Sequence, residues 1–131
     1  MKLKTALPAL MTLSSSLALA GAYQPAPVQV DLDNNFASGD MLTAANDNRN
    51  KDVFIGCGTR NFEVGSDGFF TFAFCQAQDA EGEYIVCSSE NPELIASIRA
   101  ISDFSFLSFN WKDDGAGGAG GAICSSIGIS T

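Results

Sequence analysis

Short apolar runs separated by Gly, Asp and Ser make up most of the chain from Asp52 onward. Alternation of apolar and polar residues between turn-forming residues is typical of β-strands. The pattern predicts strands over 52–62, 69–77, 83–88, 104–112 and 122–130, with a helix over 92–101 after the third strand. We therefore predict a β-rich domain, mainly antiparallel, with one α-helix in the order β-β-β-α-β-β.

The predicted helix carries its own start signal. The Asn91 side chain can accept a hydrogen bond from the first turn, and Pro92 suits that turn because it needs no amide donor there. Four apolar residues recur at helical spacing: Leu94, Ile95, Ile98 and Ile101. We expect this apolar face to pack on the sheet.

The turn between the second and third strands predicts their register. Gly82 in the left-handed position of a three-residue loop pairs Asp79 with Glu83. Counting outward from that pair sets Cys75 opposite Cys87.

The preceding turn, over residues 65–67, gives a second register in the same way. It pairs Val64 with Gly68 and sets Cys57 opposite Cys75. Three cysteines then lie in one row across three adjacent strands, where cross-strand partners are close enough to bridge.

Both faces of these strands are apolar. One face carries Phe54, Phe70, Phe72, Phe74, Tyr84 and Val86, and the other carries Val53, Ile55, Cys57, Ala73, Cys75, Ile85 and Cys87. Such a sheet is covered on both sides or closes into a barrel. The order of the elements over residues 52–130 resembles that of the OB-fold, a five-stranded barrel with a helix between its third and fourth strands. This resemblance predicts a five-stranded OB-like barrel, and a single five-stranded sheet with one packed helix is the alternative.

The N-terminus has the pattern of a secretory signal peptide. Lys2 and Lys4 precede an apolar stretch over 6–19, and small residues predict cleavage after Ala20, with Ala22 as the second choice. The apolar stretch is too short for a membrane-spanning helix, so we expect no membrane anchor. The sequence predicts an exported protein, periplasmic or extracellular, in which residues 1–20 are removed.

Residues 21–51 differ in composition from the domain over 52–131. They are rich in Pro, Asp and Asn, which predicts a partly flexible lead-in. A short helix over 40–45, capped by Ser38, is the element expected there.

After Ala20 the chain is strongly acidic. Five basic residues against fifteen acidic ones give a net charge of −10 for residues 21–131. Such a surface repels phosphate backbones, which argues against nucleic-acid binding. If the charge is functional, a basic protein partner or a divalent cation fits it best. Solubility alone is the other explanation of the charge.

The four cysteines predict two disulfides. An even number of cysteines in a short exported chain is typical of a disulfide framework, and the absence of histidine and of close cysteine pairs argues against a metal site. The hairpin register predicts a bond between Cys75 and Cys87. Elimination and barrel closure then pair Cys57 with Cys124.

No pattern of catalytic residues stands out, and none indicates a cofactor. A chain without histidine has no Ser-His-Asp or Cys-His site, and neither a P-loop nor a dinucleotide-binding glycine pattern occurs. Paired carboxylates at Asp113 with Asp114, or at Glu81 with Glu83, leave a small secreted hydrolase as the alternative.

The aromatic residues give the positive indication of function. Ten phenylalanines and one tryptophan can supply an exposed stacking surface as well as a core. We predict Trp111, Phe109 and Phe72 as candidate ligand-binding residues. The sequence therefore favours a small exported binding module for an unidentified protein or glycan over an enzyme.

Overall fold

The computed structural model describes residues 25–47, 49–66, 68–102, 105–114 and 121–130, which form a single curved sheet with two helices. The elements are β1 (Gln29–Asp31), β2 (Phe36–Asp40), α1 (Met41–Ala45), β3 (Phe54–Val64), β4 (Gly68–Gln78), β5 (Tyr84–Ser89), α2 (Pro92–Ile98), β6 (Phe106–Asp113) and β7 (Ala122–Ser130). The predicted signal peptide, its cleavage site and most of the glycine-rich segment before β7 lie outside the described residues.

The seven strands follow the order β1-β2-β6-β7-β5-β4-β3. Neighbouring strands are antiparallel except for β5 and β7, which are parallel and paired at Ser88 and Ile123. The prediction of a β-rich chain with a helix after the third predicted strand is confirmed. The predicted five strands are too few, because the region before residue 52 adds two more.

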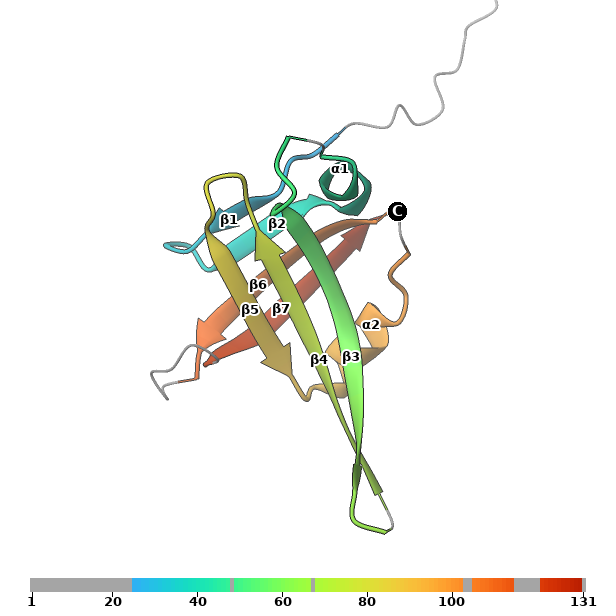
Figure 1. Ribbon diagram of the computed structural model, residues 1–131. Helices are drawn as coiled ribbons and strands as arrows, with labels where there is room; N and C mark the ends of the chain where they lie inside the picture. Colours follow the sequence, from blue (N-terminus) through green and yellow to red (C-terminus); the bar gives the residue numbers. More distant parts are fainter. Residues whose placement is uncertain (1–24, 48, 67, 103–104, 115–120, 131) are drawn as a thin grey trace, which may run out of the picture.

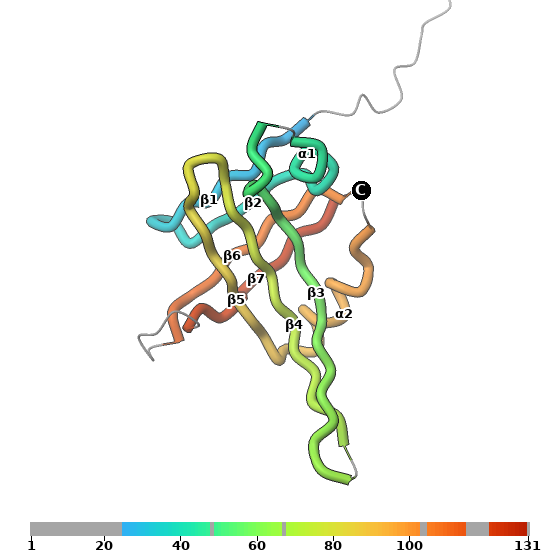
Figure 2. The backbone as a smooth tube through the Cα atoms, in the orientation of Figure 1, coloured from blue at the N-terminus to red at the C-terminus, as the bar shows by residue number. Residues whose placement is uncertain are grey.

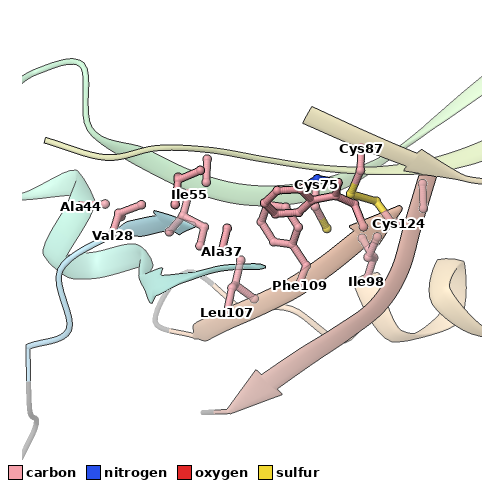
Figure 3. Packing of buried hydrophobic residues seen from close by; sticks show 14 residues of the cluster. Val28, Ala37, Ala44, Ile55, Cys75, Cys87, Ile98, Leu107, Phe109 and Cys124 are labelled. Atoms are coloured by element: carbon pink, nitrogen blue, oxygen red, sulfur yellow. A yellow bond between two sulfur atoms is a disulfide. The ribbon is translucent and has the colours of Figure 1, made fainter. Parts of the chain in front are cut away.

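The sheet coils so strongly that its two halves face each other. In Figure 1, β3, β4 and β5 lie across β6 and β7, which run behind them at a large angle, and the tube in Figure 2 follows the same path. Its edge strands β1 and β3 do not pair with each other, so the sheet is not a closed barrel and the OB-like barrel is not confirmed. The hydrophobic core fills the space between the halves (Figure 3).

Residues 21–51, expected as a partly flexible lead-in with one short helix, also contain the two strands β1 and β2. Their strand pattern is weak in sequence, since β2 reads Phe-Ala-Ser-Gly-Asp. Pairing with β6 along its whole length supplies the order that local propensity does not. Helix α1 begins one residue later than expected, and Asp40 rather than Ser38 caps it by accepting a hydrogen bond from the Thr43 amide at 2.7 Å.

The turn between β4 and β5 has the predicted form. The Asp79 amide donates to the Glu83 carbonyl at 3.1 Å, and Gly82 has a φ of 87°. The buried Asp79 carboxylate also accepts hydrogen bonds from the Glu81 and Glu83 amides, both at 3.0 Å, and from the Val30 amide at 3.2 Å. This side chain therefore fastens the edge strand β1 to the far end of β4.

Helix α2 packs as expected, although it is shorter than predicted. Asn91 caps it by accepting from the Glu93 amide at 2.8 Å, Ile98 is buried, and the other predicted apolar residues pack partly buried against the core. The helix ends at Ile98 and continues as turns through Ile101, whose amide bonds to the Ile98 carbonyl.

The predicted cysteine row is confirmed, but the predicted pairing is wrong. Cys57 stands opposite Cys75, and Cys75 stands opposite Cys87. The bonds join Cys57 to Cys75, with 4.0 Å between their Cα atoms, and Cys87 to Cys124, with 5.0 Å. The error has a topological cause: because the sheet does not close, β7 lies beside β5 rather than beside β3, and Cys124 is brought to Cys87.

Candidate functional site

Two of the three predicted ligand-binding residues lie in the core. Phe109 and Trp111 are 1% and 6% exposed, with ring centroids 6.0 Å apart. Figure 3 shows Phe109 directed from β6 toward the strand that carries Cys75. The exposed stacking surface expected at these two residues is therefore absent, and they fill the space between the two halves of the sheet.

Phe72, the third predicted residue, belongs to a part of β3 and β4 that extends beyond the body. Strand β5 ends at Ser89, opposite Ala73, so from Phe72 to Gly68 the only described strand that pairs with β4 is β3. We call residues 60–66 and 68–72 the arm. In Figure 1 the arm is the long hairpin that projects from the lower end of the molecule.

The arm exposes large apolar side chains. The exposed fractions are 78% for Phe69, 60% for Val64, 49% for Phe62 and 39% for Phe70. Scattered apolar side chains are common on protein surfaces, but four on one projecting element, with Phe62, Val64 and Phe70 on one face and Phe69 on the other, are typical of an interaction site.

Aromatic side chains also line the face of β3, β4 and β5 that points away from the core. We call this surface the aromatic face; it consists of Phe54, Phe62, Phe70, Phe72, Phe74 and Tyr84. Sequence alternation predicted this grouping apart from Phe62, which it did not include. The expected second layer over it is wrong, because Phe62, Phe70 and Tyr84 are exposed.

Ring contacts connect the aromatic face along its length. Phe62 stacks on Phe72 with centroids 5.8 Å apart, and Phe70 lies 6.1 Å from Phe72. The Arg60 guanidinium lies 5.4 Å from the centre of the Phe74 ring, within the range of a cation–π contact. Phe72 is thus the centre of an aromatic cluster that continues from the arm toward the body.

An open depression adjoins this cluster. It is lined by Phe70, Phe72, Ser88, Ser89, Glu90 and Ile123, and has a volume of about 420 Å³. That volume is within the usual range of small-ligand sites. The depression combines two aromatic rings with hydroxyl groups and one carboxylate.

A second, acidic depression lies near the far end of the sheet. Its acidic lining residues, which we call the acidic end, are Asp31, Asp33, Asp79, Glu81 and Glu83. Hydrogen bonds from the Asn34 side chain and amide lower the pKa of the exposed Asp31. Within the described ranges, no group of three or more acidic or cysteine side chains is placed to hold a metal ion.

The carboxylates considered for a hydrolase lie on exposed turns. Glu81 and Glu83 belong to the β4–β5 turn, while Asp113 ends β6 and Asp114 follows it. The hydrolase alternative stays a prediction that the geometry does not test.

Comparison with known proteins does not identify the chain. Protein-family models, curated proteins and solved structures were all searched, and none of the three comparisons gives a match. In the part of the chain that the structure describes, no helix has the length and apolar character needed to cross a membrane.

Proposed function

We propose that the protein is an exported binding module that recognises a partner protein through the arm and the aromatic face. The observation that carries this proposal is the exposure of Phe62, Val64, Phe69 and Phe70 on an element outside the core. Burial of apolar surface is worth about 25 cal/mol per Å². The exposed parts of these side chains gain none of that stabilisation in the isolated chain, but would gain it in a complex.

The two disulfides support the exported part of the proposal. Both bonds are formed, and no cysteine of the chain is free. Disulfides persist in oxidising compartments and are rare in the cytosol. They agree with the signal-peptide pattern of residues 1–20.

The charge of the chain favours a basic protein as the partner. Residues 21–131 carry a net charge of −10, and Asp33, Glu81 and Glu83 are exposed at the acidic end. Opposite charge on the partner accelerates encounter more than it tightens the complex. We therefore assign the affinity to the arm and the long-range attraction to the acidic surface.

A glycan is the second candidate ligand, and the depression beside Phe72 favours it. Sugar rings are bound by aromatic faces together with polar groups that fix their orientation. Phe70 and Phe72 supply the rings, and Glu90 with the two adjacent serines supplies hydrogen-bonding groups.

Capture experiments test the protein-binding proposal. Immobilised, oxidised residues 21–131 are incubated with envelope extract and culture supernatant, and bound proteins are quantified by mass spectrometry. The Phe62→Ser, Phe69→Ser double variant should lose at least tenfold of the captured partner. Leu32→Ser removes a side chain of 45% exposure outside the arm and should capture as the unchanged chain does.

The outcome also separates the two ligand classes. Equal capture by the arm variant and by the unchanged chain would refute the protein-binding proposal. Binding to a glycan array that is lost in Glu90→Gln, with no captured protein, would favour the glycan instead.

A further inference from the structure

The outer edge of β3 is long and pairs with no further described strand, although both helices contact β3. Strand β3 spans eleven residues, contains no proline, and carries only Arg60 and Glu63 as charged residues. Among the described residues its only strand partner is β4. Natural proteins shorten, charge or cover such edges, because an open edge pairs with other strands.

The hydrogen-bonding groups on that edge can be assigned from the β4–β5 turn. The Asp79 amide bonds to Glu83 across the turn, so odd-numbered residues of β4 direct their backbone groups toward β5. Cys75 is one of these, and Cys57 with Cys75 is therefore a non-hydrogen-bonded pair. The Cα separation of 4.0 Å between them agrees with this.

The same alternation continues along β3. Odd-numbered residues direct their amides and carbonyls away from β4, so these groups face the open edge. These residues are Ile55, Cys57, Thr59, Asn61 and Glu63. The edge therefore offers a regular row of donors and acceptors to a further strand.

We propose that this edge pairs with the same edge of a second copy of the chain, antiparallel, about a two-fold axis at Thr59. Thr59 is the central residue of β3, so this register uses the full length of both strands. Odd residues then meet odd residues, and the outward groups of the two copies match. About ten backbone hydrogen bonds result, the number carried by a typical specific interface.

Side-chain sizes along β3 are complementary in this register. Gly56 lies opposite Phe62 of the second copy, and Gly58 lies opposite Arg60 of the second copy. A Cβ added at Gly56 would meet nothing within 4 Å, so there is open space on the aromatic face beside it. The exposed Phe62 ring fills that space, and an aromatic side chain covering a strand glycine is a known stabilising pair.

The net charge of −10 on each copy opposes association, but charged residues within the two paired strands do not add to that repulsion. Arg60 faces a glycine and Glu63 faces Ile55, so no like charges stand directly opposite each other. The β4–β5 turn, which carries part of the acidic end, lies at the opposite end of the hairpin from the arm tip (Figure 1). A two-fold antiparallel arrangement therefore places the two β4–β5 turns at opposite ends of the pair.

The pairing extends the proposed function, because it would combine the binding surfaces of two chains. This consequence rests on the proposed function. Because odd residues meet odd residues, the aromatic faces of both copies lie on the same side of one continuous sheet. The arm of each copy extends along the body of the other. The ligand surface would then be built from two chains.

Sedimentation velocity of the oxidised chain from residue 21, over a wide range of concentrations, tests the pairing. The unchanged chain should sediment as a dimer. Thr59→Pro should raise the dimer dissociation constant at least tenfold, because proline removes an amide that faces the edge and not one that bonds to β4. Thr59→Ala keeps that amide and should remain dimeric.

A second variant tests the pairing independently in case Thr59→Pro does not fold. Gly56→Lys places a charged side chain in the open space where Phe62 of the second copy would lie, and should give a monomer with unchanged near-ultraviolet circular dichroism. Gln76→Lys adds the same charge opposite Gly56 on β4, one strand away from the edge, and should leave the dimer intact.

A monomer at all concentrations, or a dimer that survives both Thr59→Pro and Gly56→Lys, would overturn the pairing. These outcomes would not by themselves contradict the proposed binding function. A monomeric chain that still captures protein through Phe62 and Phe69 would retain the proposed function and lose only the pairing.

Discussion

The β3–β4 hairpin has two parts that belong to the same antiparallel pairing: the root, where β4 also pairs with β5, and the arm. They differ in whether their side chains are buried against other elements. At the root, where β5 adjoins, core-side residues such as Ile55, Cys75 and Ala77 are buried. Further out, the same side of the strands carries Asn61 and Thr71, which bond to each other at 2.7 Å between hydroxyl and amide oxygen. The aromatic side shows no such change, because Phe62 and Phe70 continue its apolar row into the arm.

Comparison of the two faces distinguishes apolar residues that stabilise the fold by burial from apolar residues that stay exposed. On the core side, Asn61, Glu63 and Thr71 are polar where the body ends, whereas Phe69 on the same side is apolar and 78% exposed. On the aromatic side, apolar residues continue past that point, and Phe62 and Phe70 remain exposed there. Stability of the isolated body does not account for their exposed surface, and the binding function proposed above would.

Truncation of a core side chain beneath the root should have the largest effect. Phe109→Ala removes a ring that is 1% exposed, and should lower the free energy of unfolding by about 3–5 kcal/mol. Urea unfolding followed by fluorescence of Trp111 measures the change. A loss below 1 kcal/mol would mean that the two halves of the sheet are not packed as described.

The two disulfides should contribute unequally. In the chain-entropy model, loops of 37 and 18 residues correspond to about 4 kcal/mol for Cys87–Cys124 and about 3 kcal/mol for Cys57–Cys75. The double variants Cys87→Ser, Cys124→Ser and Cys57→Ser, Cys75→Ser allow the comparison by thermal unfolding. The first double variant should melt at the lower temperature. The reverse order would show that the Cys57–Cys75 bond within the hairpin contributes more to stability than the Cys87–Cys124 bond to β7 does.

Loss of the Asp79 carboxylate should have an intermediate effect. Asp79→Ala leaves the buried Val30 amide without its acceptor and should cost about 1–3 kcal/mol. Hydrogen exchange of that amide should accelerate most. Protection equal to that in the unchanged chain would contradict the role of Asp79 in holding β1.

The smallest effect on stability is expected in the arm. Phe69→Ser replaces a ring that is 78% exposed and should change the free energy of unfolding of the monomer by less than about 0.5 kcal/mol. Urea unfolding of Gly56→Lys and of Gly56→Lys with Phe69→Ser measures this in a background designed to be monomeric. Destabilisation comparable to that of Phe109→Ala would show that the arm contributes to the stability of the fold as the core does.

Local signals in the sequence were sufficient for most of the secondary structure. Apolar alternation located β3 to β7 within a few residues, Asn91 and Pro92 located the start of α2, and Gly82 set the register of the cysteine row. These features depend on neighbours along the chain. Apart from Phe62, the aromatic face was predicted for the same reason, since alternation alone places its residues together.

Features that depend on long-range pairing were missed. Strand β2 is ordered by β6, some seventy residues later, and the neighbour of Cys124 depends on where β7 enters the sheet. Alternation placed Phe109 and Trp111 on one side of a strand but could not indicate which side meets the core. The arm was not recognised, although the predicted bounds and register already leave residues 69–73 beyond the end of the third predicted strand.

The Cys57–Cys75 bond has a practical consequence for any study of the arm by proteolysis. It brackets the whole hairpin tip, so a protease that cuts between Val64 and Gly68 leaves two fragments joined by sulfur. On a non-reducing gel the nicked chain would migrate much as the intact one does. Reductant would separate the pieces, and the difference between the two gels would report the fraction of molecules whose arm had been cut.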